Sequence, residues 1–157
     1  LDGSMTTDRQ GDPLFYTKEL PGLVGNPEET GIRVIKWHPS NGAYYEHMVL
    51  FRYADAHLMK AEAIMRGGTG ENALDLVNEI RGWRDATPLS SLTDQDMLDE
   101  RGREMYNEMW RRQDLIRFGK FTEEWEFKPE SEEFRVLFPI PNIALTSNPN
   151  LTQNEGY

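Results

Sequence analysis

Arginine is concentrated in the stretch from Glu100 to Lys120, although the chain as a whole carries a formal net charge of −10. A guanidinium group can bind phosphate oxygens of nucleic acids or lipids, or it can pair with carboxylates inside the protein. Proteins that bind polyanions present net positive surfaces, so the acidic balance argues against nucleic acid and against anionic lipid. The stretch therefore favours an ionic network within the protein. Its arginines are Arg101, Arg103, Arg111, Arg112 and Arg117.

The spacing within this stretch also favours burial of its charges. From Leu98 to Leu115, alternating steps of three and four residues mark one helical face that carries both apolar and charged residues. A buried guanidinium must be paired with carboxylates or carbonyl oxygens, and an earlier predicted helix carries carboxylates close to its apolar stripe. We therefore predict a structural ionic network. Its predicted members are Asp55, Glu62, Arg101, Glu108 and Arg112.

Four acidic residues stand close together near the start of the same segment: Asp94, Asp96, Asp99 and Glu100. Two carboxylates can act as a glycosidase pair, and several can hold calcium. The spacing lacks the glycine and the terminal glutamate of an EF-hand loop, and a glycosidase pair needs a separation in space that spacing alone does not provide. A helix N-terminus, which favours negative charge, accounts for the cluster. We predict no catalytic residue in this cluster.

Metal and cofactor sites are not indicated by the sequence. The histidines, His38, His47 and His57, are isolated, and a separation of ten residues does not place two of them on one helical face. There is no cysteine, hence no disulfide and no thiolate ligand. Neither a Gly-rich phosphate loop nor a nucleophile elbow occurs. We predict no metal and no cofactor.

Aromatic side chains offer the one hint of a ligand surface. Sugars stack their apolar C–H faces on aromatic rings while their hydroxyl groups need polar partners. Tyr44 and Tyr45 lie in the loop SNGAYYEH and are candidate ligand-binding residues, although a loop tyrosine more often serves packing than ligand binding. Trp83 falls on an apolar helical stripe and is predicted to belong to the core.

The elements predicted to position these residues are helical. Helices are expected over 47–66, 71–85 and 93–119, the first ended by GGTG at 67–70 and the third opened by a capping box from Thr93 to Asp96. The first two have the dimensions of one tetratricopeptide-type hairpin. The fold class is therefore predicted as all-α, with tetratricopeptide-like helical hairpins.

Long ordered loops and an extended C-terminal strap complete the expected fold. Residues 1–46 form a loop-rich segment with one brief strand at 31–39, and we expect this segment to continue from a missing N-terminal part. Residues 47–157 form the helical region of the same domain. From Phe121 onward four prolines favour extended backbone, which we expect to pack along the helices. A single hairpin cannot bury both its faces, so we do not expect the chain to fold stably by itself.

Four motifs, taken in order, resemble the C-terminal region of the SusD/RagB family. They are RYADAHLMKAEA (52–63), ALDLVNEIRGW (73–83), ERGREMYNEMWRRQDLIRFGK (100–120) and LFPIPNIALTSNPNLTQNEGY (137–157). GIRVIKWHP at 31–39 resembles the segment that precedes them. Two positions depart from the family pattern: Met109 stands where glycine is frequent, and Arg112 stands where an aromatic residue is frequent.

The resemblance implies a function for the whole protein. Family members are outer-membrane lipoproteins at the cell surface, anchored through an N-terminal cysteine that would lie in the missing part of this chain. They bind glycans or other nutrients and deliver them to a TonB-dependent SusC-like transporter, and they are not enzymes. The implied partners are the ligand, the transporter and the remaining N-terminal part. The alternative function is a tetratricopeptide-like scaffold for protein–protein interaction. No family motif identifies a binding residue here.

Overall fold

The computed structural model of the chain describes residues 7–32, 36 and 49–157. These residues fall into two compact units: 7–32, 36 and 125–129 belong to the first, and 49–124 with 130–157 to the second. The described residues contain helices and isolated bridges but no strand, which confirms the predicted all-α class. The helices are α1 (Tyr53–Met65), α2 (Ala73–Trp83), α3 (Asp94–Glu104), α4 (Arg111–Arg117), the 3₁₀ helix η1 (Glu133–Val136) and α5 (Asn142–Ser147).

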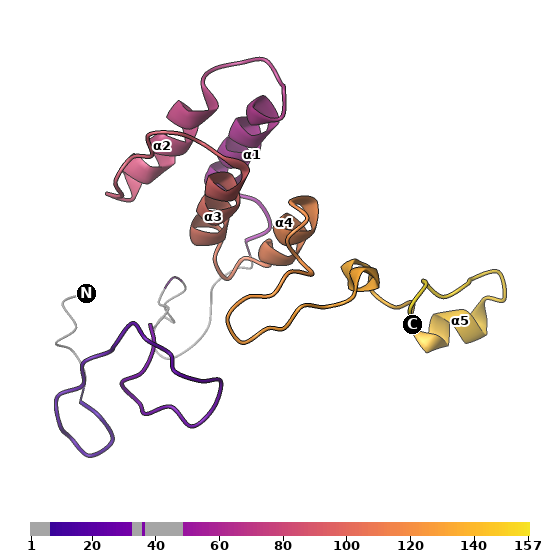
Figure 1. The fold of residues 1–157 in the computed structure, drawn as a ribbon, viewed down its shortest axis with the longest axis horizontal. Coiled ribbons are helices and arrows are strands. Elements are labelled where there is room, and N and C mark those ends of the chain that lie inside the picture. Colours follow the sequence, from indigo (N-terminus) through magenta and orange to yellow (C-terminus); the bar gives the residue numbers. More distant parts are fainter. Residues whose placement is uncertain (1–6, 33–35, 37–48) are drawn as a thin grey trace. The chain divides into compact units, whose positions relative to one another are not determined.

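The core of the second unit lies between α1, α2 and α3. Helices α1 and α2 pack side by side as the predicted hairpin, and α3 packs on α1 (Figure 1). Leu58, Ala61, Val77 and Ile80 are fully buried there, and Met97 of α3 closes the cluster. The small side chain of Ala61 lets the neighbouring helix approach closely. Each buried leucine or isoleucine contributes about 1.5–3 kcal/mol relative to an exposed one.

Helix α1 begins later than the sequence pattern predicts. The start was expected at His47, which lies outside the described residues, but residues 49–52 are not helical and the helix starts at Tyr53. Arg52 is the N-cap residue and has the extended backbone usual there (φ −145°, ψ 164°), and its guanidinium is held by acidic residues of α3 and the turn after it. Phe51, expected on the buried stripe, is 75% exposed. The other end agrees with the prediction, since Gly67 adopts the left-handed φ of 103° just after the helix.

Helix α2 and the start of α3 have the expected caps. Asn72 accepts a hydrogen bond from the backbone N–H of Leu74 at the start of α2. Thr93 and Asp96 form the predicted capping box at the start of α3. Trp83 differs from its prediction: it ends α2 and is 42% exposed, so it is not a core residue.

The third predicted helix is broken into two. Helix α3 ends at Glu104 and α4 begins at Arg111, with Asn107 (φ 59°) and Met109 (φ 64°) in the left-handed region between them. Neither conformation fits a continuous right-handed helix. The prediction of one helix over 93–119 is therefore wrong, and its single helical face does not exist as a continuous surface.

The C-terminal tail, residues 130–157, is not an extended strap. It contains η1 and α5, and α5 starts directly after Pro141, the residue at its N-cap. Pro149 then prevents continuation. Apolar residues of the tail are largely exposed, for example Phe138 at 69% and Ile143 at 77%. The prolines thus delimit a short helix where the sequence pattern predicted extended chain throughout.

The first unit consists of loops in its described part. Two isolated bridges, Thr7 with Pro13 and Trp125 with Lys128, are its regular backbone pairings among the described residues. The Asp8 carboxylate accepts hydrogen bonds from the backbone of residues 10 and 12. Most of the predicted strand at 31–39 lies outside the described residues. In the described part of the chain, none of the helices has the length and apolar character needed to cross a membrane.

Candidate functional site

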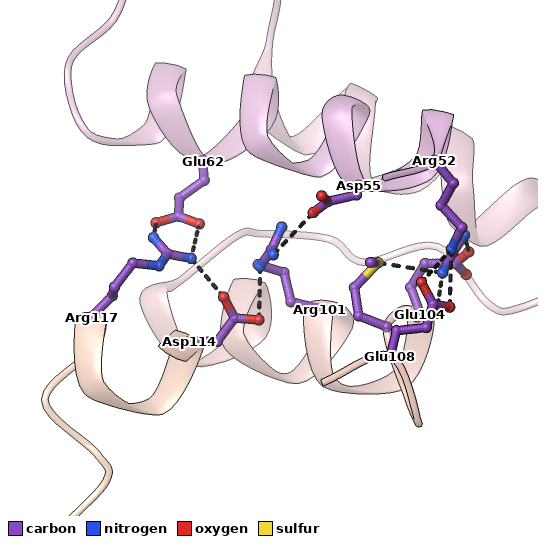
Figure 2. Close-up of polar contacts among 9 residues, drawn as sticks. Arg52, Asp55, Glu62, Arg101, Glu104, Glu108, Asp114 and Arg117 are labelled. Carbon is purple, nitrogen blue, oxygen red and sulfur yellow. Dashed lines mark hydrogen bonds and ion pairs between the residues drawn. The ribbon is translucent and has the colours of Figure 1, made fainter. Parts of the chain in front are cut away.

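Arg101 lies at the centre of a buried ionic network. Its side chain is 2% exposed, and its Nη2 lies 3.1 Å from Oδ1 of Asp55 on α1. Its Nε lies 2.9 Å from Oδ2 of Asp114 on α4. Both carboxylates are 1% exposed (Figure 2). One guanidinium thus joins three helices, and the planar fork of arginine suits such a double contact better than a lysine would.

A second group of charges extends the network toward the C-terminal end of α1. Glu62 accepts hydrogen bonds from both Arg66 and Arg117, the first at 2.8 Å. Arg117 also donates to Asp114 at 2.7 Å and so links this group to Arg101. Burial opposes ionisation of Glu62, but the hydrogen bonds from Arg117 and Arg66 outweigh it and lower the pKa of this carboxyl. The hydrogen bond to Glu62 raises the pKa of Arg117.

A third group lies at the start of α1. Arg52 Nε contacts Glu108 at 2.8 Å, and Arg52 Nη1 contacts Glu104 at 2.5 Å (Figure 2). Arg84, at the end of α2, donates to Glu104 at 2.7 Å. Burial alone would raise the pKa of Glu104, but hydrogen bonds from Arg84 and Arg52 bring it below its ordinary value. This group therefore ties the ends of three helices together.

The break between α3 and α4 makes the central group possible. In a continuous helix, the 13 residues from Arg101 to Asp114 would span about 20 Å along the axis. An arginine side chain cannot bridge that distance. The left-handed residues Asn107 and Met109 turn the chain between α3 and α4, so that Asp114 Oδ2 lies 2.9 Å from Nε of Arg101.

Arg112 lies outside this network, contrary to the sequence-based prediction that it is one of its members. Its guanidinium stacks over the rings of Phe121 and Phe138, at 4.7 and 4.0 Å from their centroids. It donates hydrogen bonds to the backbone carbonyl groups of Arg135 and Val136. The reason is the helix break, because Glu108 and Arg112 no longer share one helical surface. Arg112 instead attaches the C-terminal tail to α4.

The structure brings four of the five predicted network residues into ion pairs, namely Asp55, Glu62, Arg101 and Glu108. Sequence reasoning missed several of their partners: Arg52, Arg66, Arg84, Glu104, Asp114 and Arg117. A local signal existed for three of these partners, because Arg66 stands four residues after Glu62, and Asp114 and Arg117 stand three residues apart. Arg52 gave no such signal, because it lies in the extended segment before α1.

The acidic cluster at the start of α3 has structural partners. Asp96 accepts from the backbone and hydroxyl groups of Thr93. Glu100 is buried and accepts hydrogen bonds from Arg81 and Arg103 at 2.6 and 2.7 Å. Within the described ranges, no group of three or more His, Asp or Glu side chains is arranged to hold a metal ion.

The predicted ligand-binding residues Tyr44 and Tyr45 lie outside the described residues, as do His38 and His47. His57 is buried on α1, where its Nε2 lies 3.1 Å from the carbonyl oxygen of Leu76 and 3.2 Å from Glu79. Its ring packs against Tyr53 and the half-exposed Trp83. These contacts attach α1 to α2, so the buried His57 has a structural role in the packing of the hairpin.

A helical hairpin with a third helix packed on it, joined by buried ion pairs, defines a scaffold of the helical-repeat class. The SusD family model matches residues 24–130. This chain belongs to the SusD family.

Individual relatives agree with this assignment. The chain is 36% identical over 146 residues to the starch-binding protein SusD of Bacteroides thetaiotaomicron, an alignment that covers 81% of this chain and 26% of that protein. It is 32% identical over 165 aligned positions to a SusD-like protein of Formosa agariphila, which covers 95% of this chain and 32% of that one. A solved laminarin-binding SusD-like protein has a TM-score of 0.60 and 32% identity, over 73% of this chain and 24% of its own. The chain thus spans between a quarter and a third of its curated relatives' length.

Proposed function

We propose that this chain is part of a cell-surface protein that binds glycans. The observation that supports this most strongly is the 36% identity, over 81% of the chain, to a starch-binding protein. The similarity to a laminarin-binding protein points the same way and suggests glucose polymers as the ligand class. We further propose that the protein has no enzyme activity of its own.

The remaining steps of the proposal follow the family. The full-length protein is anchored in the outer membrane through a lipidated cysteine upstream of this chain. It hands its ligand to a TonB-dependent SusC-like transporter. The ionic network of α1, α3 and α4 has a structural role in this scheme, since its charges are already paired within the protein. Tyr44 and Tyr45 are proposed ligand contacts on sequence grounds.

The direct test is glycan titration of the full-length protein by isothermal calorimetry. Maltoheptaose represents starch, and laminarihexaose represents laminarin. Saturable heat with at least one of them, without release of new reducing ends, is the expected result. Failure of both glucans, and of a wider panel of plant and algal polysaccharides, would refute glycan binding.

A tetratricopeptide-like scaffold for protein partners is the second candidate function. It is favoured by the exposed apolar side chains at one end of the α1–α2 hairpin, among them Tyr53 at 71% and Trp83 at 42% exposure. Co-purification of the full-length protein with a SusC-like transporter, combined with the glycan titration, separates the two candidates. Strong transporter binding without any glycan binding would favour the scaffold.

A further inference from the structure

A cavity of about 420 Å³ opens beside the ionic network in the second unit. Residues of α1, α3 and α4 form its wall, together with Trp110 at the N-cap of α4. Met59 and Trp110 contribute apolar surface to the wall, and Gln113 an exposed amide. Its volume lies in the range of pockets that hold small ligands.

The buried wall of this cavity contains an unsatisfied donor. Arg101 uses Nη2 and Nε for its carboxylate partners, but its Nη1 has no hydrogen-bond acceptor among the described residues. The side chain is 2% exposed and lines the cavity. A buried N–H group without an acceptor is energetically unfavourable. This atom has almost no accessible surface, so it lies behind the wall and a ligand oxygen cannot reach it. The donors that a ligand oxygen can reach are the half-exposed guanidinium groups of Arg66 and Arg117, which also line the cavity.

The electrostatics of the wall select for a neutral ligand. Glu62 and Asp114 oppose an anion, while Arg66 and Arg117 oppose a cation, and each of these side chains is already engaged in an ion pair. A neutral molecule rich in hydroxyl groups meets no such opposition. Its oxygens can accept from arginine, and its hydroxyl hydrogens can be donated to the free lone pairs of the carboxylates.

The cavity wall also contains an aromatic ring on which a sugar can stack, that of Trp110. Trp110 is half-buried, and its ring also contacts Phe51, with centroids 6.1 Å apart. An indole face is apolar and suits the C–H face of a pyranose ring. We infer that this cavity is a binding site for one glycosyl residue of a neutral glycan, with Trp110 as the stacking surface and the half-exposed Arg66 and Arg117 as donors to its hydroxyl oxygens. The inference rests on the proposed glycan-binding function.

Calorimetric titration of the full-length protein with laminarihexaose and maltoheptaose tests the inference. Trp110→Ala removes the stacking surface and is expected to raise the Kd by at least about tenfold. Ala63→Trp places a bulky ring at the mouth of the cavity from an exposed position on α1, and is expected to weaken binding similarly. Trp83→Ala is the matched control, because Trp83 is a partly exposed tryptophan that does not line the cavity.

The outcomes separate the inference from the proposed function. Weaker binding in both cavity variants, with the control unchanged, supports the site. If Trp110→Ala loses its helical circular dichroism, Ala63→Trp decides alone. Unchanged affinity in a folded Ala63→Trp variant overturns the inference while glycan binding by the wild type still stands. A wild-type protein that binds no glycan overturns both.

Discussion

Replacement of Arg101 by methionine is the sharpest test of the ionic network. The substitution keeps a long side chain in the core but removes the guanidinium that pairs with both Asp55 and Asp114. Those two carboxylates are 1% exposed, so neither can recover its hydration without opening the structure. Breaking a buried ion pair by removing one partner costs about 3–5 kcal/mol. Asp114 keeps Arg117 as a partner at 2.7 Å, which places the expected loss at the lower end, about 3 kcal/mol.

The assay is urea unfolding of the full-length protein followed by far-ultraviolet circular dichroism. Arg101→Met should lower the midpoint without a change in the slope of the unfolding free energy against urea. Arg103→Met is the control, because Arg103 is 55% exposed and its ion pair in the described part of the chain is with Glu100, so its loss should cost less than about 1 kcal/mol.

A compensated variant distinguishes unpaired charge from lost packing. Asp55→Asn and Asp114→Asn, combined with Arg101→Met, remove all three charges and should recover most of the lost stability. If the single variant Arg101→Met stays within 1 kcal/mol of the wild type, the network has no structural role and the reasoning fails.

Three further perturbations follow from the geometry. Met109→Gly should stabilise the protein by about 0.5–1 kcal/mol in urea unfolding, because Met109 is 69% exposed at a left-handed φ of 64° and glycine adopts that region freely; a loss of stability would contradict this. Gly156→Ala should loosen the C-terminal tail and raise its amide hydrogen exchange, because a Cβ there would lie 2.4 Å from Cγ of Phe134; unchanged exchange would argue against the contact. Acidification should lower the free energy of unfolding. Glu62 and Glu104 have pKa values in the folded protein below their ordinary 4.5. The stabilisation that each carboxylate gives is therefore complete above that pH, and it is lost as the pH falls through the lowered pKa values of the folded protein. Unfolding measured between about pH 6 and pH 3 should show this loss, and equal stability at both ends would exclude it.

The sequence predicted the helical hairpin well because apolar spacing and caps are local signals. Leu58 and Ala61 on α1 and Val77 on α2 are buried as their periodicity indicates. The capping box at Thr93 is present because its two partners stand three residues apart and need no distant contact. Trp83 was wrongly predicted as a core residue. Periodicity identifies the apolar face of a helix, but it does not show which end of that face is exposed to solvent.

The helix break and the network partners could not be read from the sequence in the same way. Met109 adopts a left-handed φ that methionine disfavours, so only tertiary contacts can impose it. Because the break was not predicted, Arg112 was placed on one helical face with Glu108, whereas Glu108 is paired with Arg52 from a distant segment. Such pairs depend on how helices are arranged in space, and spacing along one helix does not encode that arrangement.

The long-range ion pairs have a consequence for how the second unit folds. Three of them join α1 and the residue before it to the α3–α4 region, across sequence separations of 46, 55 and 56 residues. Closing one loop of this length costs about 3.5 kcal/mol of chain entropy. After Asp55 has paired with Arg101, the other two pairs close shorter loops, because their residues lie near these two along the chain. The three contacts therefore form and break together, and α1 and α4 share one cooperative opening transition despite the distance between them along the chain.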